Sequence, residues 1–296
     1  MTLLDSIIQG TIQGLAEFLP VSSSGHIMLF NHFFGMSEFS LFYSAMLHVG
    51  TLFSVFVVFR KEIFQMIKAA FGMIGDIFKG RFKYSECDEY RRSVIMILVT
   101  LIPLLAFYLI KDYYDFLTVD NDIVFEGCCF MITGVMLLLA SGCVHGNRTG
   151  VDMKVKDPLI IGIVQGISTL PGISRSGSTI SAGILLGLDC NFMIAFSFIM
   201  GIPAVIGSAG SELLEAVESG AEIDVPMIAV GIAVAFVVGL LSIFLLKWIM
   251  KKDRLGIFGY YTAFLGAVVI ILGTVEHLCG LTVPQLINDL LNRGVV

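Results

Sequence analysis

Two polar segments with matching residues stand 152 positions apart in a largely apolar chain. The first reads QGLAEFLPVSSSGH and covers residues 13–26, and the second reads QGISTLPGISRSGS and covers residues 165–178. Between them they carry Glu17, His26 and Arg175. An ionisable group at membrane depth is unfavourable by roughly 2.5–3.5 kcal/mol, so such groups usually mark a functional site.

The first segment combines a carboxylate with the start of a helix. Gln13 and Glu17 are four residues apart and share a helix face. Pro20 stops that helix, one of the serines at 22–24 can cap the next one, and Gly25 allows close backbone approach. A helix start offers free N–H groups and a positive dipole end, which together make an anion site.

The second segment repeats this arrangement with Ser174, Ser176 and Gly177, and it adds Arg175. The guanidinium is a permanent, forked cation that matches phosphate oxygens. The combined inventory suits phosphoryl chemistry. Helix starts and the arginine would bind the charge, a serine or histidine would attack phosphorus, and the carboxylate with the Gln13 amide would hold a divalent cation or position water.

Other interpretations of the same residues stay open. Serines after a proline can serve only to satisfy freed backbone groups. Glu17 could be a protonated acid bonded to a neighbour, and Gln13 and Gln165 could be simple hydrogen-bonding residues between helices. His32 and His48 are expected to be packing or interface residues. The matched spacing of two copies favours the functional interpretation.

The composition is that of an integral membrane protein. Of 296 residues, 56% are hydrophobic and 14% charged, against about 25% charged in soluble domains, and the mean hydropathy is +0.91. The net charge of −6 comes without basic arms, so no nucleic-acid partner is expected. The N-terminus lacks a basic region before its first apolar stretch, which argues against a cleaved signal peptide.

Six uncharged stretches of 18 to 22 residues are long enough to cross a bilayer. They are Leu41–Phe59, Ser93–Ile110, Gly127–Asn147, Cys190–Ser211, Val225–Leu246 and Leu255–Val275. The two polar segments interrupt the regions Thr2–Phe34 and Pro158–Leu188, whose halves are too short to cross. We therefore expect each region to form a helix–turn–helix hairpin that enters and leaves on one side, with its turn covered by protein or water.

Loop charges predict the orientation of these spans. Basic residues predominate at 60–92, 145–157 and 247–254, which we assign to the cytoplasm, and acids predominate at 111–122 and 212–224, which we assign to the outside. Each half of the chain, 1–147 and 148–296, then holds one hairpin and three spans. Because three is odd, the halves have opposite orientations. We predict an all-α integral membrane fold with an inverted repeat, about six transmembrane helices and two re-entrant hairpins whose turns meet near the midplane.

The two motifs together resemble those of the undecaprenyl-diphosphatase family, also called the bacitracin-resistance family. The resemblance rests on Gln13 and Glu17, then PVSSSGH at 20–26 and PGISRS at 171–176, and it extends over nearly the whole chain. Many members carry Glu where this chain has Gln13. The amide keeps an oxygen ligand and lacks the negative charge.

The resemblance implies specific roles at these positions. Glu17 would bind a divalent cation, Mg or Ca, with Gln13 as a second ligand. Ser23 and His26 would form the nucleophilic centre, with a serine nucleophile and a histidine base preferred over a histidine nucleophile, and Arg175 would grip the diphosphate. The residues expected to support substrate binding are Ser22, Ser24, Gly25, Ser174, Ser176, Gly177 and Thr179.

The implied reaction is hydrolysis of undecaprenyl diphosphate to undecaprenyl phosphate and inorganic phosphate. This recycles the lipid carrier of cell-wall synthesis and confers bacitracin resistance. The resemblance implies a multi-pass protein of the bacterial plasma membrane, with a site facing the periplasm or exterior and a homodimer as an open alternative to a monomer. The rival function is an alternating-access transporter, or flippase, of a polyprenyl phosphate, because paired broken hairpins are typical of such carriers.

Overall fold

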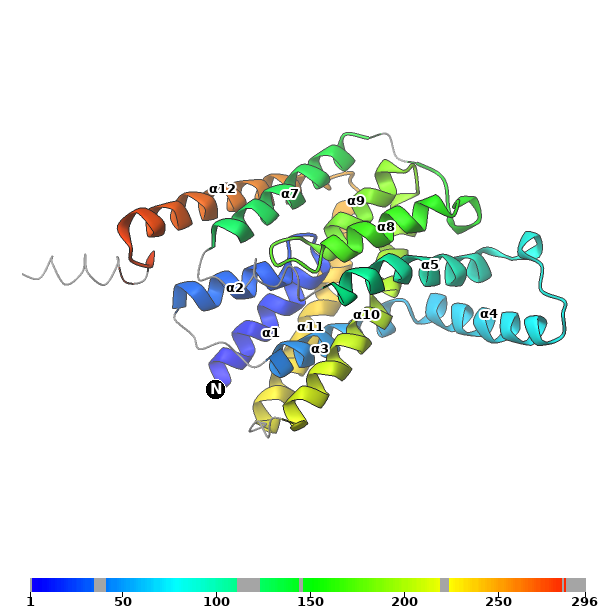
Figure 1. Ribbon diagram of the computed structural model, residues 1–296, viewed down its shortest axis with the longest axis horizontal. Coiled ribbons are helices and arrows are strands. Elements are labelled where there is room, and N and C mark those ends of the chain that lie inside the picture. The colour runs from blue at the N-terminus through cyan, green and yellow to red at the C-terminus, as the bar shows by residue number, and fades with distance from the viewer. Residues whose placement is uncertain are drawn as a thin grey trace, which may run out of the picture.

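The computed structural model describes residues 2–34, 41–110, 123–143, 146–218, 224–283 and 285. Within these residues the regular structure is helical (Figure 1). One isolated bridge joins Arg148 and Leu188. The elements are α1 (Leu3–Phe18), α2 (Ser23–Phe34), α3 (Leu41–Val58), α4 (Arg60–Phe78), η1 (Tyr84–Glu86), α5 (Glu89–Leu109), α7 (Val124–Ser141), η3 (Gly150–Asp152), α8 (Lys156–Ile167), α9 (Arg175–Leu185), α10 (Cys190–Glu218), α11 (Val225–Met250) and α12 (Gly256–Cys279).

Helices α5, α7, α10, α11 and α12 are long and apolar enough to cross a membrane. A sixth span arises if α3 and α4 are counted together, although the chain bends by 86° between them. These helices match the six predicted stretches and confirm the all-α integral membrane class. The orientation stays a prediction, since the loop 111–122 and residues 219–223 lie outside the described residues.

The segment 60–92 differs from the plain loop that its charge suggested. Most of it is α4, a 19-residue helix that lies beside α5 (Figure 1). Its basic residues alternate with apolar side chains at helical spacing, and Ile63, Met66 and Met73 are buried. The charge of the segment predicted only that it is polar. Its apolar residues recur with a 3.6-residue period, and this period is typical of a helix with one buried face.

Both predicted hairpins are present as pairs of short helices, α1–α2 and α8–α9. A Thr2–Asp5 capping box starts α1, and Leu19, just before Pro20, adopts extended backbone at its end. Each turn needs one residue in the left-handed region, Ser22 at φ 73° and Gly172 at φ 90°. Glycine adopts this conformation freely, whereas at serine it is strained, and such strain is concentrated at functional sites.

The hairpins are held by close helix packing across the chain. Helix α1 packs on α11, and α8 packs on α5. A Cβ added at Gly14 would lie 2.8 Å from the Val238 Cβ, and one at Gly162 would lie 2.5 Å from the Thr100 carbonyl oxygen. Small residues let helix backbones approach in this way inside a membrane. Each hairpin thus packs on a span from the other half, and the division at residue 147 stays a prediction.

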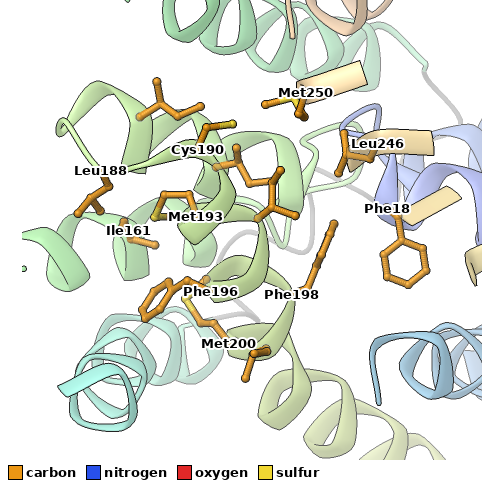
Figure 2. Close-up of a cluster of buried hydrophobic side chains, with 14 of the residues drawn as sticks. Phe18, Ile161, Leu188, Cys190, Met193, Phe196, Phe198, Met200, Leu246 and Met250 are labelled. Carbon is orange, nitrogen blue, oxygen red and sulfur yellow. The ribbon is translucent and has the colours of Figure 1, made fainter. Parts of the chain in front are cut away.

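The main apolar core lies beside the tip of the first hairpin. Phe18, at the end of α1, meets Phe198 of α10 edge to face, with ring centroids 5.2 Å apart (Figure 2). Helix α10 also contributes Met193 and Met200, which are fully buried (Figure 2). Because Phe18 directly follows Glu17 in the chain, this packing positions the carboxylate that the sequence singled out.

Candidate active site

The turns of the two hairpins meet at the carboxylate of Glu17. Its Oε2 accepts a hydrogen bond from the Ser23 hydroxyl at 2.8 Å, and its Oε1 accepts one from the guanidinium of Arg175. The Ser176 hydroxyl donates to the backbone oxygen of Glu17 at 3.3 Å. Ser23 and Arg175 occupy equivalent positions in the two copies of the motif. The structure therefore brings both copies onto one carboxylate, which is buried with 7% of its side chain exposed.

Serine caps start the second helix of each hairpin. The Ser22 hydroxyl accepts from the Gly25 N–H at 3.3 Å, and the Ser174 hydroxyl accepts from the Gly177 N–H at 3.1 Å. These are the caps that the sequence predicted. The first N–H groups of a helix have no carbonyl partner within it, so each helix start is electropositive.

The two motif glycines allow the turns to approach each other. A Cβ added at Gly25 would lie 2.9 Å from the Gly172 Cα of the second turn, and one at Gly177 would lie 3.0 Å from the Pro20 Cβ of the first. The first distance is shorter than real Cβ contacts allow, and the second is tighter than about nine in ten of them. Close approach at Gly25 was expected from the sequence; that the neighbour is the opposite turn follows only from the structure.

Gln13 lies one turn before Glu17 and faces it. Its Nε2 donates to the Glu17 Oε2 at 3.0 Å and contacts the His48 Nδ1 at 2.9 Å. Its Oε1 is buried and has no hydrogen-bond partner among the residues that the structure describes. A buried amide oxygen without a partner is an exception that a bound ion or water molecule would explain.

His48 was expected to be a packing or interface residue, and the structure places it against Glu17 and Gln13. It projects from α3 so that its Nδ1 lies 3.3 Å from the Glu17 Oε2 as well as next to Gln13. The signal was present in the sequence, because His48 is an ionisable residue in the middle of an otherwise uncharged span. An ionisable group at membrane depth was the reason for choosing His26, and the same reason applies to His48.

His26 is held by its backbone neighbour and by a distant tyrosine. Its Nδ1 lies 2.7 Å from the Ser22 carbonyl oxygen, and its Nε2 lies 2.7 Å from the Tyr261 hydroxyl. Since a carbonyl oxygen only accepts, Nδ1 carries the hydrogen and the lone pair of the neutral ring is at Nε2. In the described part of the chain, His26 and Ser23 do not hydrogen-bond to each other, so the expected serine–histidine pair is not assembled.

The remaining predicted residues support the second turn. The Thr179 hydroxyl lies 2.6 Å from that of Ser197 and donates to the Arg175 carbonyl at 2.8 Å. Thr133 of α7 accepts from the Ser174 N–H at 3.0 Å. Thr133 and Ser197 were missed because each is a lone hydroxyl in an apolar helix, which usually bonds only to its own backbone. Ser24 is exposed at the mouth of the first turn.

Gly201 of α10 sets the position of the arginine. A Cβ there would overlap the Arg175 Nη1. We expect Gly201→Ala to displace the guanidinium and to lower turnover by about 10- to 100-fold, the size of an effect from misplacing a group by about 1 Å. Gly207→Ala is the matched control, because on the same helix its Cβ would meet nothing within 4 Å. Equal activity of the two variants, measured as phosphate release, would show that Arg175 does not need this position.

The chain matches known proteins over most of its length. It matches the family described as Bacitracin resistance protein BacA over residues 6–268. Similar curated proteins include an Undecaprenyl-diphosphatase of Alkaliphilus metalliredigens, 37% identical over 274 residues (92% of this chain and 98% of that protein), and one of Desulfosudis oleivorans, 39% identical over 274 residues (91% and 98%). Another, of Methanosphaera stadtmanae, is 35% identical over 279 residues (93% and 99%). This chain therefore belongs to the bacitracin resistance protein BacA family.

Proposed function

We propose that this protein hydrolyses undecaprenyl diphosphate to undecaprenyl phosphate and inorganic phosphate. The reaction recycles the lipid carrier of cell-wall synthesis and so confers bacitracin resistance. The names of its relatives support this activity. The observation that carries it is the meeting of two capped helix starts and one arginine at the buried Glu17 carboxylate. Such a group of donors binds an anionic head group.

The diphosphate would bind between the helix starts of α2 and α9. Arg175 now pairs with Glu17, but a guanidinium has five N–H donors in a fork and can serve the carboxylate and a phosphate together. Its side chain is 22% exposed, so part of it is open to a ligand. The prenyl tail would stay among the apolar helices while the head group reaches the polar turns.

We propose His26, rather than Ser23, as the group that acts on phosphorus. The Ser23 hydroxyl already donates to Glu17, whereas the His26 ring has its N–H fixed on the Ser22 carbonyl and its lone pair at Nε2. Nε2 would attack the terminal phosphorus, undecaprenyl phosphate would leave, and water would then release phosphate from the imidazole. Glu17 holds Arg175 and Ser23 in place for this step.

A divalent cation, Mg or Ca, fits the residues next to Glu17. The Gln13 Oε1 is buried without a partner among the described residues, while the Nε2 of the same amide donates to the Glu17 carboxylate. Cations of this type prefer oxygen ligands and are often held by one or two protein groups with substrate phosphates and water. The described residues contain no cluster of three His, Cys, Asp or Glu residues that could hold a metal by themselves. When bound, the cation would neutralise phosphate charge.

Phosphate release separates this function from its rival, a polyprenyl phosphate flippase. We expect the purified protein to release phosphate from a long-chain prenyl diphosphate, and we expect a chelator to stop the release. Gln13→Glu should shift the metal titration toward lower concentrations by about tenfold, because a carboxylate replaces a neutral amide as ligand. An unchanged titration would remove Gln13 from the cation site. Lipid transfer across liposomes without phosphate release would favour the transporter.

We also infer the location and partners of the protein. It would reside in the bacterial plasma membrane, with lipids and the prenyl diphosphate as its partners, and its site would open toward the exterior. The basic charge of the segment at 60–92 predicts that this segment is cytoplasmic, which sets the orientation of the spans. A cysteine at Lys83 that reacts with an impermeant reagent in intact cells would overturn it. A homodimer stays a prediction.

A further inference from the structure

We infer that Tyr261 is a further residue of this site: its hydroxyl caps Nε2 of His26 in the resting protein and passes to the diphosphate when substrate takes its place. The inference deepens the proposed function and rests on it. Tyr261 belongs to α12, the last span, and no sequence motif points to it. The contact joins residues 235 positions apart.

The direction of this hydrogen bond follows from the partners of the imidazole. The His26 Nδ1 must donate to the Ser22 carbonyl, so in the neutral ring Nε2 can only accept. A phenol keeps its proton at neutral pH, and the Tyr261 hydroxyl lies 2.7 Å from Nε2. Tyr261 therefore donates to the lone pair that phosphoryl transfer requires. While this bond is present, Nε2 cannot attack phosphorus.

Of the two aromatic side chains that contact the His26 ring, Tyr261 is the one that can move away. Phe130 of α7 is fully buried and meets the imidazole edge to face at 5.3 Å, so it is fixed. The Tyr261 ring stacks on the imidazole with an interplanar angle of 12° and centroids 5.8 Å apart, yet 45% of Tyr261 is exposed. A partly exposed side chain can swing away, whereas a buried one in a packed core cannot.

The location of Tyr261 also fits the arrival of a lipid head group. Its neighbours Tyr260 and Phe264 on α12 are 71% and 72% exposed, so this face of the helix borders the lipid. A second contact joins α2 to α12 near the C-terminal ends of both helices: the His32 Nε2 lies 2.8 Å from the Glu276 carboxylate. In the proposed path, a head group moves in from the lipid beside α12 and meets the partly exposed Tyr261 before Nε2. The freed hydroxyl would then donate to a phosphate oxygen.

An ordinary interfacial tyrosine is the alternative to this role. Tyrosines gather where a membrane helix meets polar groups, and their hydroxyls take any partner within reach. The Tyr260–Tyr261 pair provides the matched comparison, because the two residues share the helix and the side-chain chemistry, and only Tyr261 contacts His26. Tyr261→Phe removes one hydroxyl at the site, and Tyr260→Phe removes one outside it.

The first measurement is the rate at which diethyl pyrocarbonate modifies His26 in the full-length protein in detergent, followed by peptide mapping. This reagent attacks an unprotonated ring nitrogen. We expect Tyr261→Phe to speed the modification of His26 by about fivefold, the equivalent of one neutral hydrogen bond. Tyr260→Phe should leave the rate unchanged, and His48 should react equally in all three proteins. An unchanged rate at His26 in Tyr261→Phe would overturn the cap.

The second measurement is steady-state hydrolysis of a prenyl diphosphate. We expect Tyr261→Phe to lower kcat by about 10-fold or more, since a hydrogen bond to a charged phosphate is lost, while Tyr260→Phe keeps native turnover. We thus expect faster modification of His26 together with slower turnover. A general loss of packing in the variant would not give this pattern, because it would speed the modification of His48 as well. Faster modification with native kcat would overturn the transfer of the hydroxyl to phosphate. If the protein without substitutions released no phosphate, the proposed function would fail. The modification rates would still show whether the Tyr261 hydroxyl protects the His26 Nε2.

Discussion

Replacing Arg175 with alanine is expected to reduce phosphate release by about 1,000-fold or more. An arginine that stabilises charge on a transferring phosphoryl group contributes roughly 10³ to 10⁵ in rate. Here Arg175 is the cation that the second hairpin brings to the buried Glu17, at the start of α9. The measurement is the initial rate of phosphate release from a prenyl diphosphate at saturating divalent cation.

The loss must be separated from a loss of folding, because Arg175→Ala also leaves Glu17 buried without its ion-pair partner. Breaking such a pair typically destabilises a protein by about 3–5 kcal/mol. The double variant Glu17→Gln with Arg175→Ala removes both charges and should recover thermal stability without recovering activity. Arg175→Lys keeps the charge but loses the fork, so it should fold normally and remain well below native activity. Near-native turnover of Arg175→Ala would refute the site assignment.

Replacing His26 with alanine is expected to reduce phosphate release by at least about 1,000-fold, since the nucleophile of a covalent mechanism has no substitute. Ser23→Ala should lose far less, about 10-fold, because the Ser23 hydroxyl orients the Glu17 carboxylate and is not paired with His26. Mass spectrometry of peptides after a brief reaction should find phosphate on the peptide that contains position 26 in Ser23→Ala and none on it in His26→Ala. If Ser23→Ala were as inactive as His26→Ala, the serine nucleophile preferred from the resemblance would be reinstated.

The sequence by itself determined the architecture of the hairpins and most of the polar residues in the site. Pro20 and Pro171-Gly172 break apolar runs at places where no backbone can cross a membrane unpaired, so a hairpin was the available solution. Serine caps were expected at both helix starts, and the structure selects Ser22 from the three candidate serines of the first turn and has Ser174 at the second. These signals are local: each depends on residues within four positions of one another, and such short-range rules can be read without a fold.

Only the tertiary structure decided which of these groups act on one another. Ser23 could turn to His26 or to Glu17, and the packing of α1 and α10 around Phe18 places the carboxylate within its reach. His48 and Tyr261 joined the site from α3 and α12, across 35 and 235 residues of sequence. Residues so far apart share no helical period, and their contact depends on how whole helices cross. The spacing of the motifs specified the two turns, whereas helix packing specified the partners of Glu17 and His26.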